Sequence, residues 1–294
     1  MGVDNLKYSY VTNYKNNDAL RHSFNELTEK TFYFNFVEWF NNGFWSEKYI
    51  PCSLVDGEKV IANISINLMD FNMDGTEKHY IQIGTVMTDE EYRGQGLSRY
   101  LMERVIAEYK EKVDGIYLFA NDSVVNFYTK FGFIRGMEYQ YSKAVNVANN
   151  KMQIEHVNMA DKTKRQNFLD TVKKSVSNGR FSMDNFGLTA FWTTGPMSDL
   201  VYYCADEYAY VIAYKERENL WIYQIISTHK VNLEKIISSF DGTIKKVSLG
   251  FTPYDTNGYD VRQFHKEDCT LFYLGKDLEN IEKEKLIFQT LSHA

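Results

Sequence analysis

The sequence predicts an α/β protein that is built on a mixed, mainly antiparallel sheet flanked by helices. Runs of alternating or β-branched apolar residues, which are typical of strands, are separated by stretches with a helical period. One such strand is followed by a glycine-containing loop and a helix, which is how a crossover between parallel strands begins. After a polar stretch near the middle of the chain, the order of strands and helices starts again.

The elements of the first half follow from these periodicities. Asp18 is expected to cap a first helix that continues to about Lys30, and the aromatic-rich run 31–45 is expected to form a second short helix that stops near Gly43. Asp56-Gly57 is typical of a tight hairpin turn. The remaining predicted elements are strands at 8–12, 50–55, 59–69, 80–88, 115–120 and 133–143 and helices at 97–112 and 121–132.

The polar stretch at 144–152 predicts a boundary between two domains, residues 1–145 and 146–294. A length of 294 residues suits two domains better than one core. The second half again begins with a short strand and a helix, here preceded by Asp161. Its other predicted elements are strands at 202–214, 220–227, 245–251 and 269–274 and a helix at 231–240. We interpret the second half as a diverged α/β copy of the first.

The loop at residues 93–98, with the sequence RGQGLS, is the most specific local feature of the chain. Gly94 and Gly96 allow the backbone to turn tightly and to approach a ligand closely. The backbone amides of 94–98 would point out of the helix N-terminus, where a pyrophosphate satisfies both the free donors and the helix dipole. Arg93 adds a cation or braces the loop. The missing Walker pattern argues against ATP, and the missing third glycine argues against a dinucleotide.

Two motifs in sequence order resemble those of one enzyme family. The loop resembles the R/Q-x-x-G-x-G/A signature of the GNAT superfamily of acetyl-CoA-dependent N-acetyltransferases, and 121–133 resembles its N-x-x-A-x-x-x-Y-x-x-x-G-F motif. The resemblance covers roughly residues 5–143, and the second half is similar only in its element order. Ser98 and Val124 depart from the small residues of these patterns, and neither change threatens cofactor binding.

The resemblance implies a mixed sheet of GNAT type and transfer of an acetyl group from acetyl-CoA to an amine. The strand end at 86–88 would hold the pantetheine arm, and the amide of Met87 or Thr88 would polarise the thioester carbonyl. Tyr128 would act as the general acid, and Asn121 would contact the CoA arm or cap its helix. The cofactor-binding residues implied in this way are Val86, Met87, Thr88, Arg93, Gly94, Gln95, Gly96, Leu97, Ser98 and Asn121.

The sequence leaves the general base open. Glu38, Glu47, Asp70 and His79 are conceivable by position, and deprotonation through water without a single base is an equal alternative. Gln82, at a comparable strand position, is neutral and cannot serve.

The acceptor is open as well. In the GNAT family the region between the first two strands shapes the acceptor site, and here it is dense in aromatic residues. Core packing explains most of them, while Trp39, Phe44 or Trp45 are candidates for apolar or cation–π contacts with an amine. The possible acceptors are amino acids, polyamines, antibiotics, peptide N-termini and lysine side chains. The acidic charge and the two-domain size favour a small amine.

Composition narrows the partners and the location. The net charge of −6 argues against nucleic acid. Cys52, Cys204 and Cys269 are odd in number and far apart, which predicts free thiols and no metal site. The N-terminus is polar and no apolar run approaches the ~20 residues of a membrane span, so we expect a cytoplasmic protein with no membrane contact.

Two other functions compete with the enzyme. The first is a non-catalytic acyl-CoA-binding sensor or regulator, and the second is an interaction module. The second half has only Thr228-His229-Lys230 before its helix and lacks the glycine loop, which predicts a single cofactor site. The second half would form one wall of the acceptor pocket or mediate formation of a homodimer.

Overall fold

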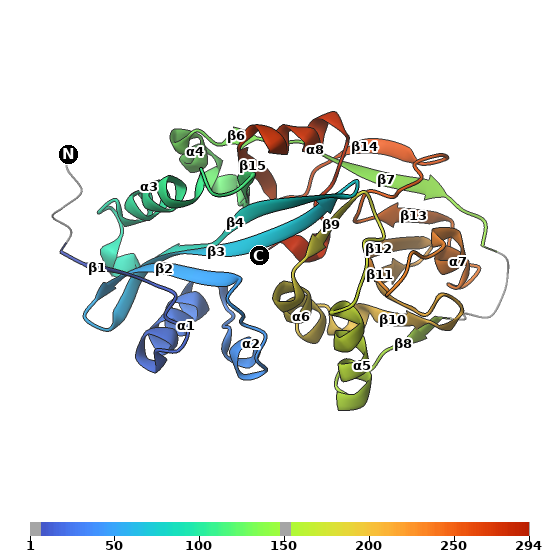
Figure 1. The fold of residues 1–294 in the computed structure, drawn as a ribbon, viewed down its shortest axis with the longest axis horizontal. Helices are drawn as coiled ribbons and strands as arrows, with labels where there is room; N and C mark the ends of the chain where they lie inside the picture. Colours follow the sequence, from blue (N-terminus) through green and yellow to red (C-terminus); the bar gives the residue numbers. More distant parts are fainter. Residues whose placement is uncertain (1–6, 148–153, 294) are drawn as a thin grey trace.

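The structure is a computed structural model that describes residues 7–147 and 154–293. It consists of two mixed, mainly antiparallel sheets flanked by helices (Figure 1), which confirms the predicted fold class. Across the first sheet the strands are β1 (Ser9–Thr12), β2 (Tyr49–Asp56), β3 (Lys59–Met73), β4 (Thr76–Thr88), β5 (Gly115–Ala120), β15 (Thr270–Leu274) and β6 (Ile134–Arg135). Across the second sheet they are β8 (Ile154–His156), β10 (Val201–Cys204), β11 (Ala209–Glu216), β12 (Asn219–Ile226), β13 (Lys246–Leu249), β7 (Glu138–Ala144) and β14 (Asp260–Phe264).

Helices pack against these sheets. They are α1 (Asp18–Phe32), α2 (Val37–Asn41), α3 (Leu97–Tyr109), α4 (Val125–Tyr128), α5 (Lys162–Val172), α6 (Phe186–Thr194), α7 (Leu233–Ser238) and α8 (Asn280–Lys283). The buried aromatic residues of α1 and α2 form one core with Tyr49, while the buried face of α3 joins the isoleucines of β3 and β4 in another. In the described part of the chain, no helix is long and apolar enough to span a membrane.

Several predicted boundaries differ from the observed ones. Asn17, not Asp18, caps α1, because its side chain accepts a hydrogen bond from the Leu20 amide at 3.1 Å. β3 continues to Met73, beyond the predicted end at 69, since its last residues also pair with the additional strand β9 (Phe181–Asp184). The predicted strand 202–214 is interrupted at 205–207 by a short 3-10 turn.

The predicted helix at 121–132 is broken into two short 3-10 turns on either side of α4. The side chain of Asn121 makes no capping hydrogen bond. The following Asp122 is held instead by the second half of the chain, because its carboxylate accepts a hydrogen bond from Thr270 at 3.2 Å. This segment therefore depends on a tertiary contact for its shape and not on helix propensity.

The two halves of the chain exchange strands between the sheets: besides β9, which pairs with β3, one strand crosses in each direction. β15 comes from the second half but pairs antiparallel with β5 and β6 of the first sheet, whereas β7 pairs antiparallel with β13 and β14 of the second. The predicted single strand at 133–143 is consequently two strands, β6 and β7, in different sheets. Figure 1 shows β15 beside β6 and β7 beside β13.

The predicted division at residue 145 is thus not a division between the sheets, since β7 and β15 cross it in opposite directions. The sheets nevertheless correspond to each other. β12 and β13 pair in parallel as β4 and β5 do, and β12 carries a register shift at the equivalent place. This correspondence is what a duplicated fold would produce. That the two halves share a common ancestor stays a prediction.

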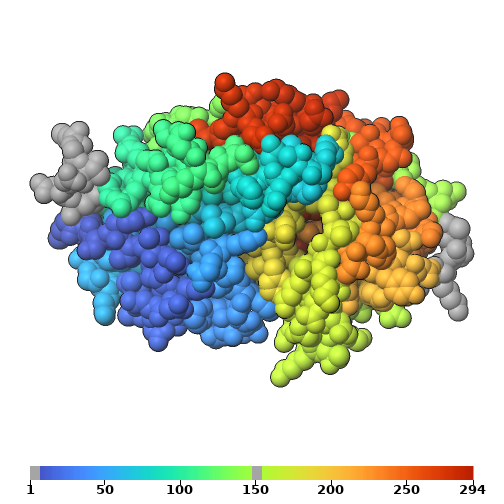
Figure 2. Space-filling model, viewed as in Figure 1, coloured from blue at the N-terminus to red at the C-terminus, as the bar shows by residue number. Residues whose placement is uncertain are grey.

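The C-terminal segment 286–293 packs between the sheets and fills the centre of the molecule. The Phe288 ring stacks on Tyr117 of β5 with a centroid distance of 4.3 Å, and the Phe288 amide donates a hydrogen bond to Glu138 of β7 at 2.8 Å. Figure 2 shows the preceding residues, around α8, lying beside those of the first half across the top of the molecule. The two halves therefore share one central core.

Glu138 makes this central contact sensitive to pH. Burial raises the pKa of its carboxyl from 4.5 to about 8, so the folded protein holds a proton that the unfolded chain releases between these values. Stability should therefore fall as pH rises from about 5 to 8. Glu138→Gln keeps an oxygen for the Phe288 amide but cannot ionise. In urea unfolding, we expect the free energy of unfolding of this variant, relative to that of the wild type, to increase from pH 5 to pH 8, because only the wild type loses stability. A difference that stays constant over this range would contradict the raised pKa of Glu138.

Candidate active site

The site begins at a distortion of β4. This strand pairs with β5 only from Tyr80 to Gln82, and further along it takes an extra residue relative to β3, where Thr85 has a positive φ of 48°. The two strands separate beyond this bulge. As a result, the end of β4 lines an open groove instead of pairing with β5.

This β4–α3 groove has a volume of about 520 Å³. Its lining residues are Thr31, Val86, Met87, Thr88, Tyr92, Arg93, Gly94, Gly96, Leu97, Ser98, Arg99, Val124, Phe127 and Tyr128. The groove thus brings together the strand end, the glycine loop and the proposed acid, which the sequence places about forty residues apart. Thr31, Arg99 and Phe127 are additions that no sequence signal singled out.

The glycine loop has the conformation that an anion site requires. Gly94 and Gly96 have φ values of 78° and 77°, which other residues adopt only with strain, and open space lies where their side chains would be. Gly96 is the N-cap of α3 and offers no side chain to the first amides of the helix. Within the described residues, no hydrogen bond from a backbone amide of 94–98 to another residue is present. These donors are available to phosphate oxygens.

All the predicted cofactor residues line the groove except Gln95 and Asn121. Gln95 accepts a hydrogen bond from the hydroxyl of Tyr8 at 3.1 Å, which occupies its side-chain oxygen. Asn121 is exposed at the start of the broken helix. Contacts of Gln95 and Asn121 with a cofactor therefore stay predictions. Neither residue is among those that line the groove.

Ser98 and Arg93 have partners that the sequence did not show. The hydroxyl of Ser98 lies 2.6 Å from that of Thr88, so the residue that departs from the family pattern joins the end of β4 to α3. Arg93 forms an ion pair with Glu90 at 3.3 Å on the rim of the groove, which favours the bracing role. Arg99 has no ion pair within the described part of the chain and is a further cation for an anionic ligand.

Tyr128 is almost fully buried against aromatic rings. Its side chain lies 5.3 Å from Phe127, 6.2 Å from Phe133 and 5.9 Å from Phe272, measured between ring centroids. Burial raises the pKa of Tyr128 to about 12, so the phenol keeps its proton at neutral pH. Since Phe272 belongs to β15, the second half of the chain helps to position this side chain in the first.

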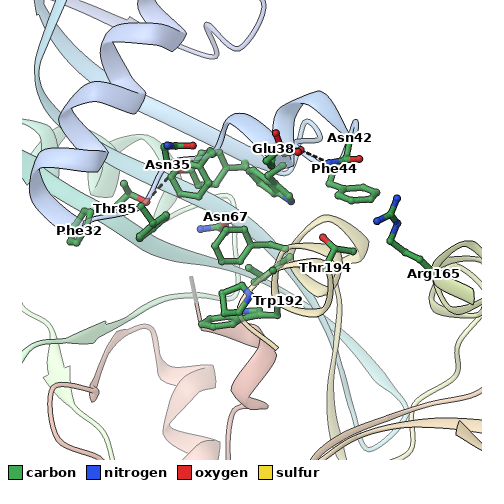
Figure 3. A pocket seen from close by; sticks show the side chains of 18 residues that line it. Phe32, Asn35, Glu38, Asn42, Phe44, Asn67, Thr85, Arg165, Trp192 and Thr194 are labelled. Carbon is green, nitrogen blue, oxygen red and sulfur yellow. Dashed lines mark hydrogen bonds between the residues drawn. The ribbon is translucent and has the colours of Figure 1, made fainter. Parts of the chain in front are cut away.

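A second, larger cavity of about 650 Å³ lies between the aromatic-rich run of the first half and α6 of the second (Figure 3). We call it the aromatic cavity. The aromatic residues that line it are Phe32, Phe34, Phe36, Trp39, Phe44, Tyr49, Phe191 and Trp192. Its remaining lining residues are Asn35, Glu38, Asn42, Asn67, Thr85, Arg165, Leu188, Thr194, Gly195 and Pro196. Thr85 lines this cavity and the next residue, Val86, lines the groove, so the two spaces border consecutive residues at the bulge.

The aromatic residues singled out from the sequence have different places. Trp39 and Phe44 line the cavity, and the indole of Trp39 donates a hydrogen bond to the carbonyl of Gly187 at 2.8 Å across the two halves. Trp45 does not line it; its indole donates to the Tyr49 carbonyl at 3.1 Å inside the core.

Of the four base candidates, only Glu38 lines the aromatic cavity. Glu47 is paired with Lys15. Asp70 bonds to both Lys48 and His79 at 2.8 Å, and the hydrogen bond to Asp70 raises the pKa of His79. None of these three candidates borders either the cavity or the groove.

Comparisons with known proteins agree with this arrangement. The sequence pattern described as "Acetyltransferase (GNAT) family" matches residues 14–133, which contain the groove and Tyr128. This match defines the class of that part of the chain: residues 14–133 match a GNAT acetyltransferase domain. Proteins of this family transfer an acyl group from a CoA thioester to an acceptor.

Three solved structures share the fold over most of the chain. A conserved Enterococcus faecalis V583 protein described as a "Probable N-Acyltransferase" has 16% identity and a TM-score of 0.60, covering 91% of this chain and 72% of that one. A GCN5-related N-acetyltransferase from Kribbella flavida has 14% identity and a TM-score of 0.53, covering 90% and 71%. One from Anabaena variabilis ATCC 29413 has 15% identity and a TM-score of 0.53, covering 91% and 72%.

Proposed function

We propose that the protein transfers an acetyl group from acetyl-CoA to a primary amine of a small molecule. The observation that carries this proposal is that the two spaces border consecutive residues at the β4 bulge. The β4–α3 groove offers free amides for a pyrophosphate, and the aromatic cavity borders Thr85, the residue just before the groove-lining end of the strand. A thioester in the groove would have its carbonyl at this junction, facing an amine in the cavity.

The chemistry follows from the groups at the junction. The neutral amine attacks the carbonyl carbon, a C–N bond forms, and the C–S bond then breaks. An amide of Met87 or Thr88 stabilises the negative oxygen, and the phenol of Tyr128 supplies the proton that the leaving thiolate takes up. The surplus proton of the amine passes to Glu38 or to water, and the Tyr128 phenolate then takes up a proton from water. A cytoplasmic location and a role of the second half in dimer formation stay predictions from the sequence.

Binding of acetyl-CoA and turnover are tested separately. Acetyl-CoA at ~100 times its dissociation constant should stabilise the protein by ~2.7 kcal/mol in thermal unfolding. Release of the CoA thiol should then depend on added amine. Stabilisation without amine-dependent release would indicate the alternative of a non-catalytic sensor, and an unchanged unfolding transition would exclude both functions.

Tyr128→Phe should lower turnover while leaving the affinity for acetyl-CoA nearly unchanged. The substitution removes the acidic hydroxyl but keeps the ring that packs on Phe127 and Phe272. General acid catalysis commonly contributes ~10²–10⁴-fold, so we expect a loss in kcat of about that size. Tyr109→Phe is the matched control, because this tyrosine of α3 lines neither space. Equal kcat values for the two variants would remove Tyr128 from the mechanism.

A further inference from the structure

The aromatic cavity contains one buried polar atom that has no partner. Asn67 lies on β3 with 3% of its surface exposed, and its Nδ2 atom makes no hydrogen bond. Figure 3 shows its side chain among the aromatic rings of the cavity. A buried donor without an acceptor destabilises a folded protein, so such an atom in a ligand-sized space indicates that a ligand supplies the acceptor.

The position of Asn67 relative to the bulge is fixed by Tyr49. Tyr49 lies directly opposite Asn67 in the pairing of β2 with β3, and its hydroxyl reaches the hydroxyl of Thr85 at 3.0 Å. Asn67 is therefore about one tyrosine side chain away from Thr85, where the cavity meets the groove. A ligand atom bound to Asn67 would lie at this separation from the reacting amine.

The walls of the cavity consist of aromatic rings from both halves that pack on one another. Phe191 of α6 contacts three rings of the first half, lying 6.1 Å from Phe34, 5.8 Å from Phe36 and 6.0 Å from Trp39. The hydrogen bond from Trp39 to Gly187 holds the same two elements together. Aromatic walls of this kind bind a planar apolar ligand with favourable ring–ring contacts.

Charged groups contribute little to this lining. Glu38 on α2 and Arg165 on α5 are the two charged residues among those that line the cavity, and Figure 3 places Arg165 at the edge of the group. A polyamine or a lysine side chain would bring its second charge or its polar backbone into contact with aromatic rings. Burial of such groups without a partner is unfavourable.

We propose that the acceptor is an aromatic amine of the arylalkyl type, with its amino group on a short alkyl chain and an uncharged hydrogen-bond acceptor on its ring, about one tyrosine length from the amino group. Asn67 donates a hydrogen bond to this acceptor atom, while Phe191 and Trp39, which pack on each other, form one wall against the ring. The second half of the chain, through α6, thereby determines specificity. This inference rests on the proposed acetyl transfer and names its substrate class.

Two amines of equal shape test the inference. We expect kcat/KM for 2-(4-methoxyphenyl)ethylamine to exceed that for 2-(4-ethylphenyl)ethylamine by about tenfold, because only the methoxy oxygen satisfies Asn67. Putrescine should be a poorer substrate than either. In Asn67→Leu the preference for the methoxy compound should disappear, while the melting temperature of the free protein stays equal or rises. Phe191→Leu should lower kcat/KM for both aromatic amines and leave the stabilisation by acetyl-CoA unchanged.

The outcomes separate this inference from the proposed function. Wild-type protein that acetyl-CoA stabilises but that prefers putrescine, or that treats the two aromatic amines alike, would overturn the substrate class. An Asn67→Leu variant that still prefers the methoxy compound would overturn the role of Asn67. If acetyl-CoA alone causes no stabilisation, the proposed function fails first, and this inference fails with it.

Discussion

Residues 1–147 expressed alone should not form a stable, cooperatively folded protein. Without β15, strands β5 and β6 lose the neighbour that joins them, and the buried Phe272 is missing from the core that supports Tyr128. β7 in turn would have no sheet to join. Circular dichroism and thermal unfolding should show no cooperative transition and no stabilisation by acetyl-CoA.

Co-expression provides the control for this prediction. Residues 1–147 and 154–294 produced together should associate and recover acetyl-CoA binding, because each fragment supplies the strand that the other lacks. A first half that unfolds cooperatively on its own, and that acetyl-CoA stabilises, would show that the exchanged strands are dispensable.

Gly96→Val should abolish the stabilisation by acetyl-CoA. With a φ of 77°, Gly96 holds a conformation that a β-branched residue adopts only with strain, and a side chain there would project into the open space at the N-terminus of α3. The ~2.7 kcal/mol expected at ~100 times the dissociation constant should be lost. Thermal unfolding with and without acetyl-CoA measures this effect.

Gly258→Val is the matched control for Gly96→Val. Gly258 has a φ of 76°, also faces open space, and lies in the second half away from both cavities. The strain is therefore similar, but the ligand site is intact. Equal acetyl-CoA stabilisation of the two variants would mean that the loop does not hold the pyrophosphate.

Local chemistry made much of the first sheet predictable. The strand β5 has the predicted ends, and the helix after the glycine loop begins at Leu97 as expected. The loop residues could be found because positive φ values and free helix amides require glycines at fixed spacing. The hydrogen bond between Ser98 and Thr88 could not be predicted in this way, since it depends on how α3 and the end of β4 meet in space.

The strand exchange could not be predicted, because an apolar strand such as 270–274 has the same pattern whichever sheet receives it. The same limit applies to the site. Asn67 occurs in a run of alternating residues that indicates only a strand, and nothing local shows that its amide lacks a partner. Phe191 lies far from the motifs in sequence, yet it closes the cavity next to the bulge.

The second half therefore contributes to the site without having a glycine loop of its own. Its β15 packs against Tyr128, and its α6 forms one wall of the aromatic cavity. We infer that the two halves function as one unit, in which the first binds the acyl donor and both bind the acceptor.

The most direct test of this account is the amine-dependent release of CoA from acetyl-CoA by the purified 294-residue chain. With acetyl-CoA saturating and an aromatic amine added, we expect thiol and acetylated amine to form in equal amounts, as measured by a thiol reagent and mass spectrometry. Omission of the amine should reduce the release to background. Tight binding of acetyl-CoA without acetylated product from any primary amine would contradict the account.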